Sequence, residues 1–369
     1  MSRIIDNTRI AVLAALALTM GCQESPVTAV DEPLNVLPTS YAIRELGLLT
    51  GGLQSQAIGG NASYIVGWGT DAAGVRRAVV FAGGAAARLQ EPAGATRSEA
   101  RDVNAAGRIV GFADIAGQRQ ALLWASPTAV PQLLPTLGGP ASFARSINTT
   151  GTILGYATTS ANDTILVTWT AAGVVQRVDP VIGSGYRPTE INDEGAIAGN
   201  AGDDDAGEEE EGFYFEPGEG FSEVETIGDA GGNDANAING AGVIAGSFTT
   251  AGGLDRAYRW TESRGMVLMG NPPTGFTGIG GNAVNDEGIF AATATTVSST
   301  GTVLTSVAAV SSIFTQSRLF TPLPTLGGTR SGVPDGGITP CGVILGWSFP
   351  TGSTNRRAVA WVPPSCTTP

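Results

Sequence analysis

The sequence of 369 residues contains no histidine and no lysine, so all 20 of its basic residues are arginine. Without histidine there can be no Ser-His-Asp or Cys-His catalytic unit, no imidazole zinc site and no histidine general base. Without lysine there can be no Schiff base and no Walker-type phosphate loop. Only carboxylates, arginine, tyrosine and serine remain for chemistry. We therefore predict a protein that is not an enzyme, with no catalytic, cofactor-binding or metal site.

Charge is also scarce. Charged residues make up 14% of the chain, against about 25% in typical globular proteins. The net charge is −13, which argues against nucleic acid as a partner and against charge-driven binding to anionic membranes. The apolar content of 42% is enough to form a folded core, so the chain does not have the composition of a disordered protein.

Residues 1–21 have the pattern of a signal peptide. Arg3 and Arg9 supply the positive charge, and the apolar run over residues 10–20 has signal length but is too short to span a bilayer. This pattern predicts export from the cytoplasm.

Gly21 and Cys22 follow the apolar run and resemble the lipobox of bacterial lipoproteins, in which the cysteine carries the lipid. The resemblance is degenerate, because Thr19 stands where the usual pattern has leucine. The alternative is an ordinary secretory signal that leaves Cys22 free. We predict lipidation of Cys22. Residues 22–40, which contain three prolines, are predicted to form a flexible tether, and residues 41–366 a folded domain.

Cys341 and Cys366 lie near the end of the chain, 25 residues apart. An oxidising compartment outside the cytoplasm favours a disulfide between them. Two unpaired thiols are the alternative.

A nine-residue phrase, Ile/Val-Asn-x-x-Gly-x-Ile-x-Gly, recurs along the chain in steps of 44 to 54 residues. The clear copies are 103–111, 147–155, 191–199, 238–246 and 284–292, and the weaker copies are 57–67 and 338–346. Seven copies at this period are typical of propellers and related arrays.

Each copy predicts four short strands. The Asn-x-x-Gly stretch suits a tight hairpin turn between the first and second strands. The third strand usually ends in an aromatic residue, and the fourth is rich in leucine. The aromatic residues are Phe81, Trp124, Trp169, Phe215, Trp260 and Trp361. No segment after residue 40 shows sustained helical periodicity, so the sequence predicts an all-β, seven-bladed β-propeller.

The ends of the array predict how the ring closes. Residues 41–49 look like a fourth strand without the preceding three, whereas residues 356–362 form a third strand without a fourth. We expect the N-terminal strand to complete the last blade, which also holds Cys341 and Cys366.

The phrases resemble the HAF repeats, an extracellular family named for a His-Ala-Phe segment. Residues 134–139 (LPTLGG), 147–155 (INTTGTILG) and 120–124 (QALLW) match the family's segments in order and spacing. The family histidine is absent throughout, replaced by Arg77, Gln120, Arg256 and Arg357. The resemblance covers most of residues 41–362. It implies an exported, surface-associated β-repeat protein and supplies no catalytic residues.

Several conspicuous residues could form sites, but each has a simpler structural interpretation. The acidic run 203–211 could bind Ca²⁺, although it lacks the alternating spacing that surrounds one ion and suits a solvated hairpin tip. The recurrent tryptophans could stack on carbohydrate, but recurrence in every repeat favours a core role. Recurrent asparagines could line a polar channel or simply form turns, and we favour turns. These asparagines are Asn104, Asn148, Asn192, Asn239 and Asn285.

The arginines at the start of the third strand could bind anionic glycans or pair with carboxylates, and we favour pairing. These arginines are Arg77, Arg119, Arg256 and Arg357. Trp68 and Trp347 each follow the glycine that ends a phrase, and a structural role is expected for both.

Together these features predict a lipid-anchored, non-catalytic scaffold of the cell envelope or outer membrane that faces the periplasm or the cell exterior. The expected partners are the membrane, through the lipid, and a polysaccharide or another envelope protein. The alternative is a propeller-type lyase or hydrolase that acts on polysaccharide with carboxylates, tyrosine and arginine. A purely structural envelope protein is a third possibility.

Overall fold

The computed structural model describes residues 37–38, 40–178, 185–202, 211–227, 231–298, 300–314 and 319–366. The predicted signal peptide, Cys22, most of the predicted tether and residues 203–210 of the acidic run lie outside these ranges. None of the described residues is in a helix, so the all-β prediction is confirmed. Accordingly, no helix among them could cross a membrane.

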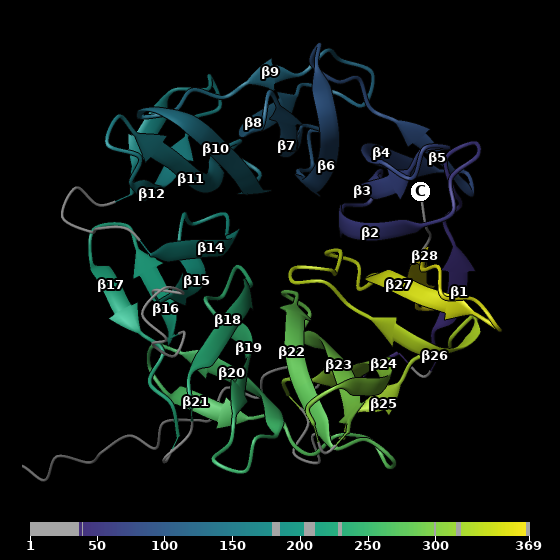
Figure 1. Cartoon of the computed structure of the whole chain (residues 1–369). Coiled ribbons are helices and arrows are strands. Elements are labelled where there is room, and N and C mark those ends of the chain that lie inside the picture. The colour runs from purple at the N-terminus through teal and green to yellow at the C-terminus, as the bar shows by residue number, and fades with distance from the viewer. Residues whose placement is uncertain are drawn as a thin grey trace, which may run out of the picture. The chain divides into compact units, whose positions relative to one another are not determined.

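Five sheets of four antiparallel strands each form the first part of the fold, and each sheet follows chain order. The first sheet contains β2 (Ser55–Gly60), β3 (Ile65–Thr70), β4 (Arg76–Ala82) and β5 (Ala85–Arg88), and the second contains β6 (Ala95–Val103), β7 (Ile109–Ile115), β8 (Gln118–Trp124) and β9 (Gln132–Leu133). The third contains β10 (Gly138–Ile147), β11 (Ile153–Thr159), β12 (Thr164–Trp169) and β13 (Val175–Arg177), and the fourth contains β14 (Tyr186–Ile191), β15 (Ile197–Ala201), β16 (Glu211–Glu216) and β17 (Gly220–Glu223). The fifth contains β18 (Asn233–Ile238), β19 (Ile244–Thr249), β20 (Asp255–Thr261) and β21 (Gly265–Leu268). Within residues 35–369, the first strand of each sheet faces a common centre (Figure 1). This arrangement is a β-propeller.

The remaining strands form a single eight-stranded sheet, so hydrogen bonding defines six sheets among the described residues and not seven. Its strands are β22 (Gly278–Val284), β23 (Ile289–Val297), β24 (Val303–Ser312), β25 (Thr321–Pro322), β26 (Gly327–Gly332), β27 (Ile344–Pro350), β28 (Arg357–Val362) and β1 (Ala42–Glu45). The merger rests on one parallel pair, Ser306 with Arg330, which joins β24 to β26. The N-terminal strand β1 pairs antiparallel with β28, as the sequence predicted.

The core lies between neighbouring sheets. One cluster, for example, joins Val110 and Leu123 of the second sheet to Ile153 and Trp169 of the third. The recurrent tryptophans are core residues, as predicted. Their exposed fraction is at most 4%, and they are Trp124, Trp169, Trp260 and Trp361. Burying a large apolar side chain contributes about 1.5–3 kcal/mol, so these repeated contacts stabilise the packing of sheet on sheet.

The glycine that ends each phrase is required by the close approach of the second strand to the first. A Cβ at Gly111 would lie 2.1 Å from the carbonyl oxygen of Glu99, and one at Gly155 would lie 1.9 Å from that of Phe143. Both distances are far below van der Waals contact, so a larger residue would force the strands apart.

Candidate ligand-binding site

The innermost strands share a β-bulge near their end, three residues before the asparagine position. The pairing register shifts there in six repeats, because each bulge adds one residue that has no partner on the neighbouring strand. The inserted residues are Ile58, Arg101, Arg145, Thr189, Asn236 and Asn282. Bulges re-aim side chains next to functional sites. The bulged position carries four kinds of residue in the six repeats, whereas the asparagine three positions later is the same in all six.

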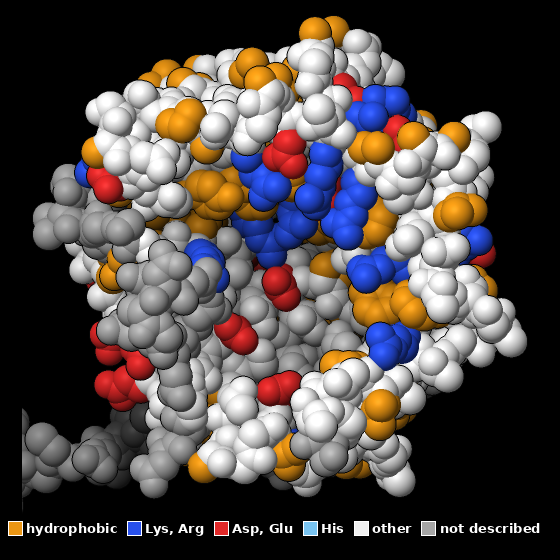
Figure 2. All heavy atoms as spheres, viewed as in Figure 1, with side chains coloured by type: hydrophobic (Ala, Val, Ile, Leu, Met, Phe, Trp, Pro, Cys, Tyr) orange, Lys and Arg blue, Asp and Glu red, His pale blue; other side chains and the backbone are white. Residues whose placement is uncertain are grey.

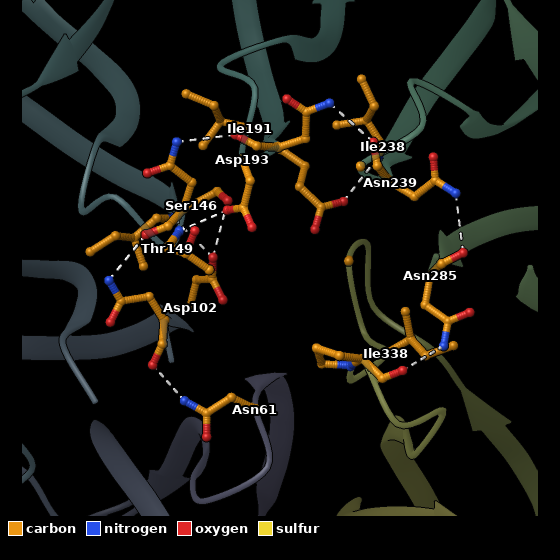
Figure 3. Close-up of a pocket in the computed structure, with 18 of the residues that line it drawn as sticks. Asn61, Asp102, Ser146, Thr149, Ile191, Asp193, Ile238, Asn239, Asn285 and Ile338 are labelled. Atoms are coloured by element: carbon orange, nitrogen blue, oxygen red, sulfur yellow. Dashed lines mark hydrogen bonds between the residues drawn. The ribbon is translucent and has the colours of Figure 1, made fainter. Parts of the chain in front are cut away.

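The innermost strands surround a central channel (Figure 1). At one of its ends, the repeated asparagines are linked by a series of hydrogen bonds, which we call the asparagine ladder (Figure 3). Each side-chain Nδ2 donates to a backbone carbonyl of the next repeat over 2.5–3.3 Å, from Asn61 through to Asn285. In five repeats, the Oδ1 also accepts the backbone N–H four residues later: these are Asn104, Asn148, Asn192, Asn239 and Asn285. The turn role that the sequence predicted is confirmed, and the link between repeats is additional.

Carboxyl groups at this end also join neighbouring repeats. The Asp102 carboxylate accepts the Ile147 N–H at 2.9 Å, and that of Glu190 accepts the Ile238 N–H at 2.9 Å. Burial raises the pKa of Asp102, and burial raises that of Glu190 to about 8. They line a cavity of about 210 Å³ together with the asparagine turns (Figure 3). Both acids are therefore engaged in holding the scaffold.

The opposite end of the repeats is not uniform. The residue after the end of the phrase is aromatic in the first three repeats and in the last, and small or polar in the other three. The aromatic residues are Trp347, Trp68, Phe112 and Tyr156, and the others are Asn200, Ser247 and Thr293. Trp68 and Phe112 are each 2% exposed, whereas Trp347 and Tyr156 are partly exposed.

Arginine guanidiniums lie over three of these rings. The guanidinium carbon of Arg76 is 4.1 Å from the Trp68 ring centroid, and that of Arg119 is 4.1 Å from the Phe112 centroid. Arg356 lies 4.9 Å from the Trp347 centroid. Such cation–π contacts contribute about 0.5–2 kcal/mol each. Because these contacts recur in three repeats, the aromatic rings support the guanidinium groups above them in the same way in each.

A buried carboxylate organises the centre of this region. The Glu99 side chain is buried, at 3% exposure, and forms three ion pairs. Its carboxylate oxygens lie 2.9 Å from a guanidinium nitrogen of Arg76, 2.5 Å from one of Arg97 and 3.6 Å from one of Arg101. Burial alone would raise the pKa of Glu99, but the hydrogen bonds from Arg97 and Arg76 and the charge of Arg101 outweigh it and lower that pKa. Glu99 is therefore ionised and partners three arginines at once.

One ion pair crosses the channel. The bulged Arg145 reaches Asp335 at 3.4 Å, although β10 and the loop after β26 belong to different sheets. Asn282, another bulged residue, donates to the same carboxylate at 3.2 Å. The side-chain exposure falls from 40% at Arg76 to 21% at Arg101 and 8% at Arg145.

We refer to six residues as the arginine cluster: Arg76, Arg97, Arg101, Arg119, Arg145 and Arg356. Figure 2 shows blue side chains gathered along one side of the central hollow, where β2, β6 and β10 lie in Figure 1. With its graded exposure, the arginine cluster runs from the rim into the channel.

Most arginines singled out from the sequence pair with carboxylates, as predicted. Arg77 contacts Asp71 at 2.9 Å and Glu91 at 3.3 Å, Arg119 contacts Asp114 at 3.1 Å, and Arg357 contacts Glu45 at 3.5 Å. Arg256 instead donates to the backbone carbonyls of Asp255 and Thr277. Five residues of the arginine cluster were not singled out from the sequence: Arg76, Arg97, Arg101, Arg145 and Arg356. Alternating charges in residues 97–101 were the available signal.

The predicted disulfide is present. Cys341 and Cys366 are bonded with an S–S distance of 1.99 Å and a Cα–Cα distance of 6.1 Å. Three partly or fully exposed glutamates, Glu216, Glu219 and Glu262, are close enough together to hold a cation. Glu216 ends β16, and Glu219 and Glu262 stand in turns after β16 and β20, away from the innermost strands. The predicted calcium alternative at residues 203–210 lies outside the described residues.

No protein-family model matches the chain, and no curated protein sequence matches it. Among solved structures, the chain is similar to the β-propeller domain of the trilobed protease from Pyrococcus furiosus, which has an open velcro topology. The TM-score is 0.56 at 11% identity, over 84% of this chain and 95% of that domain.

Two further structures are similar. Puromycin hydrolase matches with a TM-score of 0.54 at 14% identity; 86% of this chain covers 54% of the hydrolase, about half its length. Putative TolB from Agrobacterium tumefaciens matches with a TM-score of 0.44 at 12% identity, over 58% of this chain and 79% of TolB. At such identities, the similarity to the first two structures shows the fold alone: the chain is a β-propeller.

Proposed function

We propose that the protein is a non-catalytic binding propeller, which recognises a polysaccharide or another envelope component on the face that carries the arginine cluster. The observation that supports this most directly is the break in symmetry. Among the described residues, the scaffold positions recur in nearly every repeat, whereas arginines lie within 5 Å of the ring after the phrase in three repeats. A feature confined to one side of a repeat array is not explained by the packing that all repeats share.

The engagement of the channel acids supports a non-catalytic role. A general acid or base must reach the substrate with a free proton site. Asp102 instead accepts two backbone N–H groups and the Ser146 hydroxyl, and Glu190 accepts a backbone N–H of the next repeat.

An enzyme acting on polysaccharide is the second candidate, and one observation favours it. Glu190 has a pKa raised by burial to about 8, so it is largely protonated at neutral pH, as a general acid would be. Turnover of a glycan by the wild-type chain but not by Glu190→Gln would establish this alternative.

We also propose that the propeller has seven blades and is closed by β1. The eight-stranded sheet would then be two blades, β22–β25 and β26–β28 with β1, joined by the single pair of Ser306 and Arg330. The seam supports closure. The Ala358 N–H donates to Ser55 Oγ at 2.9 Å, the contact that Ala78 makes to Ser98 and Ala121 makes to Ser142 between other repeats.

The cellular setting belongs to the same proposal. A signal peptide over residues 1–21, a lipid on Cys22 and HAF-type repeats would place the propeller outside the cytoplasm on a membrane anchor. Mass spectrometry of the mature N-terminus tests this: we expect a chain that begins at a lipid-modified Cys22, and an unmodified chain that begins elsewhere would contradict it.

A binding screen tests the function. The purified full-length chain is titrated with neutral and acidic glycans and incubated with each to detect products. We expect saturable binding without turnover. Product formation would contradict the non-catalytic proposal, and binding that Arg356→Gln leaves unchanged would move the site away from the arginine cluster.

A further inference from the structure

We infer that the arginine cluster recognises the carboxylate groups of an acidic polysaccharide such as a uronic-acid polymer. This inference rests on the proposed function and names the chemical class of its ligand. Four properties of the described residues support it: local charge, donor geometry, the length of the track and the aromatic groups at its ends.

The local charge is opposite in sign to that of the whole chain. The six guanidiniums share three carboxylates, those of Glu99, Asp114 and Asp335, which leaves an excess of three positive charges. Arg356 has no carboxylate within ion-pair distance among the described residues and donates instead to the Gln56 amide at 2.8 Å. In a chain with net charge −13, a basic region of this kind indicates an anionic ligand.

Mutual repulsion is visible within the cluster. Burial, followed by the charge of Arg145, lowers the pKa of Arg101 to about 10, and burial, followed by the charge of Arg76, lowers that of Arg356. The guanidiniums of Arg101 and Arg356 nevertheless stay charged at neutral pH. A bound anion would offset the repulsion between neighbouring guanidiniums, so the cluster favours an anionic ligand.

The stacking geometry leaves donors available. A cation–π contact places the guanidinium over the ring without using its N–H groups as hydrogen-bond donors to another polar group, so they remain available for carboxylates, which arginine binds in a bidentate manner. In addition, the buried Nε–H groups of Arg97 and Arg101 have no hydrogen-bond partner among the described residues. The donors of the cluster thus outnumber its acceptors.

The track is long enough for a chain and not only for one ion. The ring-stacked arginines Arg356, Arg76 and Arg119 stand on three successive repeats, which span the seam between the last sheet and the first two. A polymer that carries a carboxylate on each unit could contact them in turn.

Aromatic pairs lie at both ends of this track. Trp347 and Phe349 have ring centroids 5.4 Å apart, and Phe143 and Tyr156 are stacked at 5.1 Å. All four are partly exposed. Such rings suit the C–H faces of sugars, which an acidic peptide lacks. This pairing of apolar ends with a basic centre favours a polysaccharide over an acidic protein.

The test measures binding of polygalacturonate to the full-length chain by calorimetry, in parallel with neutral galactan and polyglutamate. The variant is Arg356→Gln, chosen because its loss leaves no carboxylate unpaired. The matched control is Arg108→Gln, which removes the same charge at the asparagine end, where Arg108 donates to the Ala171 carbonyl. Thermal melting checks that both variants fold.

We expect polygalacturonate to bind saturably, at least tenfold more weakly to Arg356→Gln and within twofold of wild type to Arg108→Gln. Affinity should also fall as salt rises. Equal binding of polyglutamate, or equal weakening by both variants, would overturn the inference by showing charge attraction alone. Binding of neutral galactan alone would overturn it while leaving the proposed function intact, and release of products would overturn the proposed function itself.

Discussion

The two ends of the channel are built from the same strands but follow opposite rules. At the asparagine end, six side chains make the same bond to the next repeat, from Asn61 through to Asn285. At the arginine end, stacked guanidiniums occur on three repeats, and the equivalent positions elsewhere carry other residues. Uniform contacts serve the fold, which every repeat needs, whereas the uneven end can serve a ligand.

The largest effect should come from removing β1, which pairs with β28 at the proposed closure of the propeller. Replacing residues 41–49 by a Gly/Ser segment of equal length removes β1 and the buried Leu46, whose N–H donates to the Ala358 carbonyl. We expect the melting temperature to fall by about 10 °C or more, because an open sheet edge and core contacts are lost together. Calorimetry provides the measurement, and a shift below about 2 °C would contradict closure by β1.

A single break in the uniform end should cost less. Asn192→Ala removes the acceptor of the Ala196 N–H at 2.8 Å and the donor to the Asn239 carbonyl at 3.1 Å. We expect a loss of about 2–3 kcal/mol in the free energy of unfolding, because buried backbone groups lose their partners. Glycan binding should stay unchanged.

Asn192→Asp is the matched variant: it keeps the acceptor but replaces the donor with a carboxylate oxygen, which also places a negative charge beside the Asn239 carbonyl. Urea unfolding of both variants separates the turn bond from the inter-repeat bond. If Asn192→Asp were as stable as wild type, the ladder would contribute nothing.

The buried acid of the uniform end should make stability depend on pH. The pKa of Glu190 is raised to about 8 in the folded chain, above its ordinary value, so the folded state keeps a proton that the unfolded state loses. Stability from this group is therefore present at low pH and falls as pH rises from about 4.5 to about 8. Glu190→Gln should remove this dependence. At pH 8 we expect its free energy of unfolding, measured by urea denaturation, to exceed that of wild type by about 2–4 kcal/mol. Equal pH profiles would contradict the prediction.

The smallest effect should come from completing the ladder. Thr339 stands at the asparagine position of the last repeat; its Oγ accepts the Val343 N–H at 3.0 Å, but threonine has no amide to donate onward. We expect Thr339→Asn to stabilise the fold by about 0.5–1 kcal/mol through a bond to the Asn61 carbonyl. Thr339→Ser is the control, and destabilisation by asparagine beyond that of serine would contradict the prediction.

The sequence predicted the scaffold because the scaffold is repeated. The spacing of the phrase, the buried Trp124 and Trp169 and the Cys341–Cys366 bond all follow from period, burial and compartment. The bulges could not be predicted, since they depend on pairing register between strands, and register is not visible in one strand alone. Arg145 therefore looked like an ordinary strand residue, although it reaches Asp335, 190 positions away in the chain.

The sheet count shows a second limit. One parallel pair, Ser306 with Arg330, is enough to merge two groups of strands that the repeat spacing treats as separate. Such a contact depends on how neighbouring sheets approach each other, and the spacing of motifs along the chain carries no information on it.

The recurrent bulge has a consequence for how such a protein can change. A bulged residue takes no part in the ladder pairing of its strand, so exchanging it leaves the pairing register in place. Three of the six bulged residues serve the fold: Ile58 is buried, and Thr189 and Asn236 donate to carbonyls of the next repeat. Residues 101, 145 and 282 remain as positions that can be randomised together, and a library over these three would retain one framework while presenting many different linings.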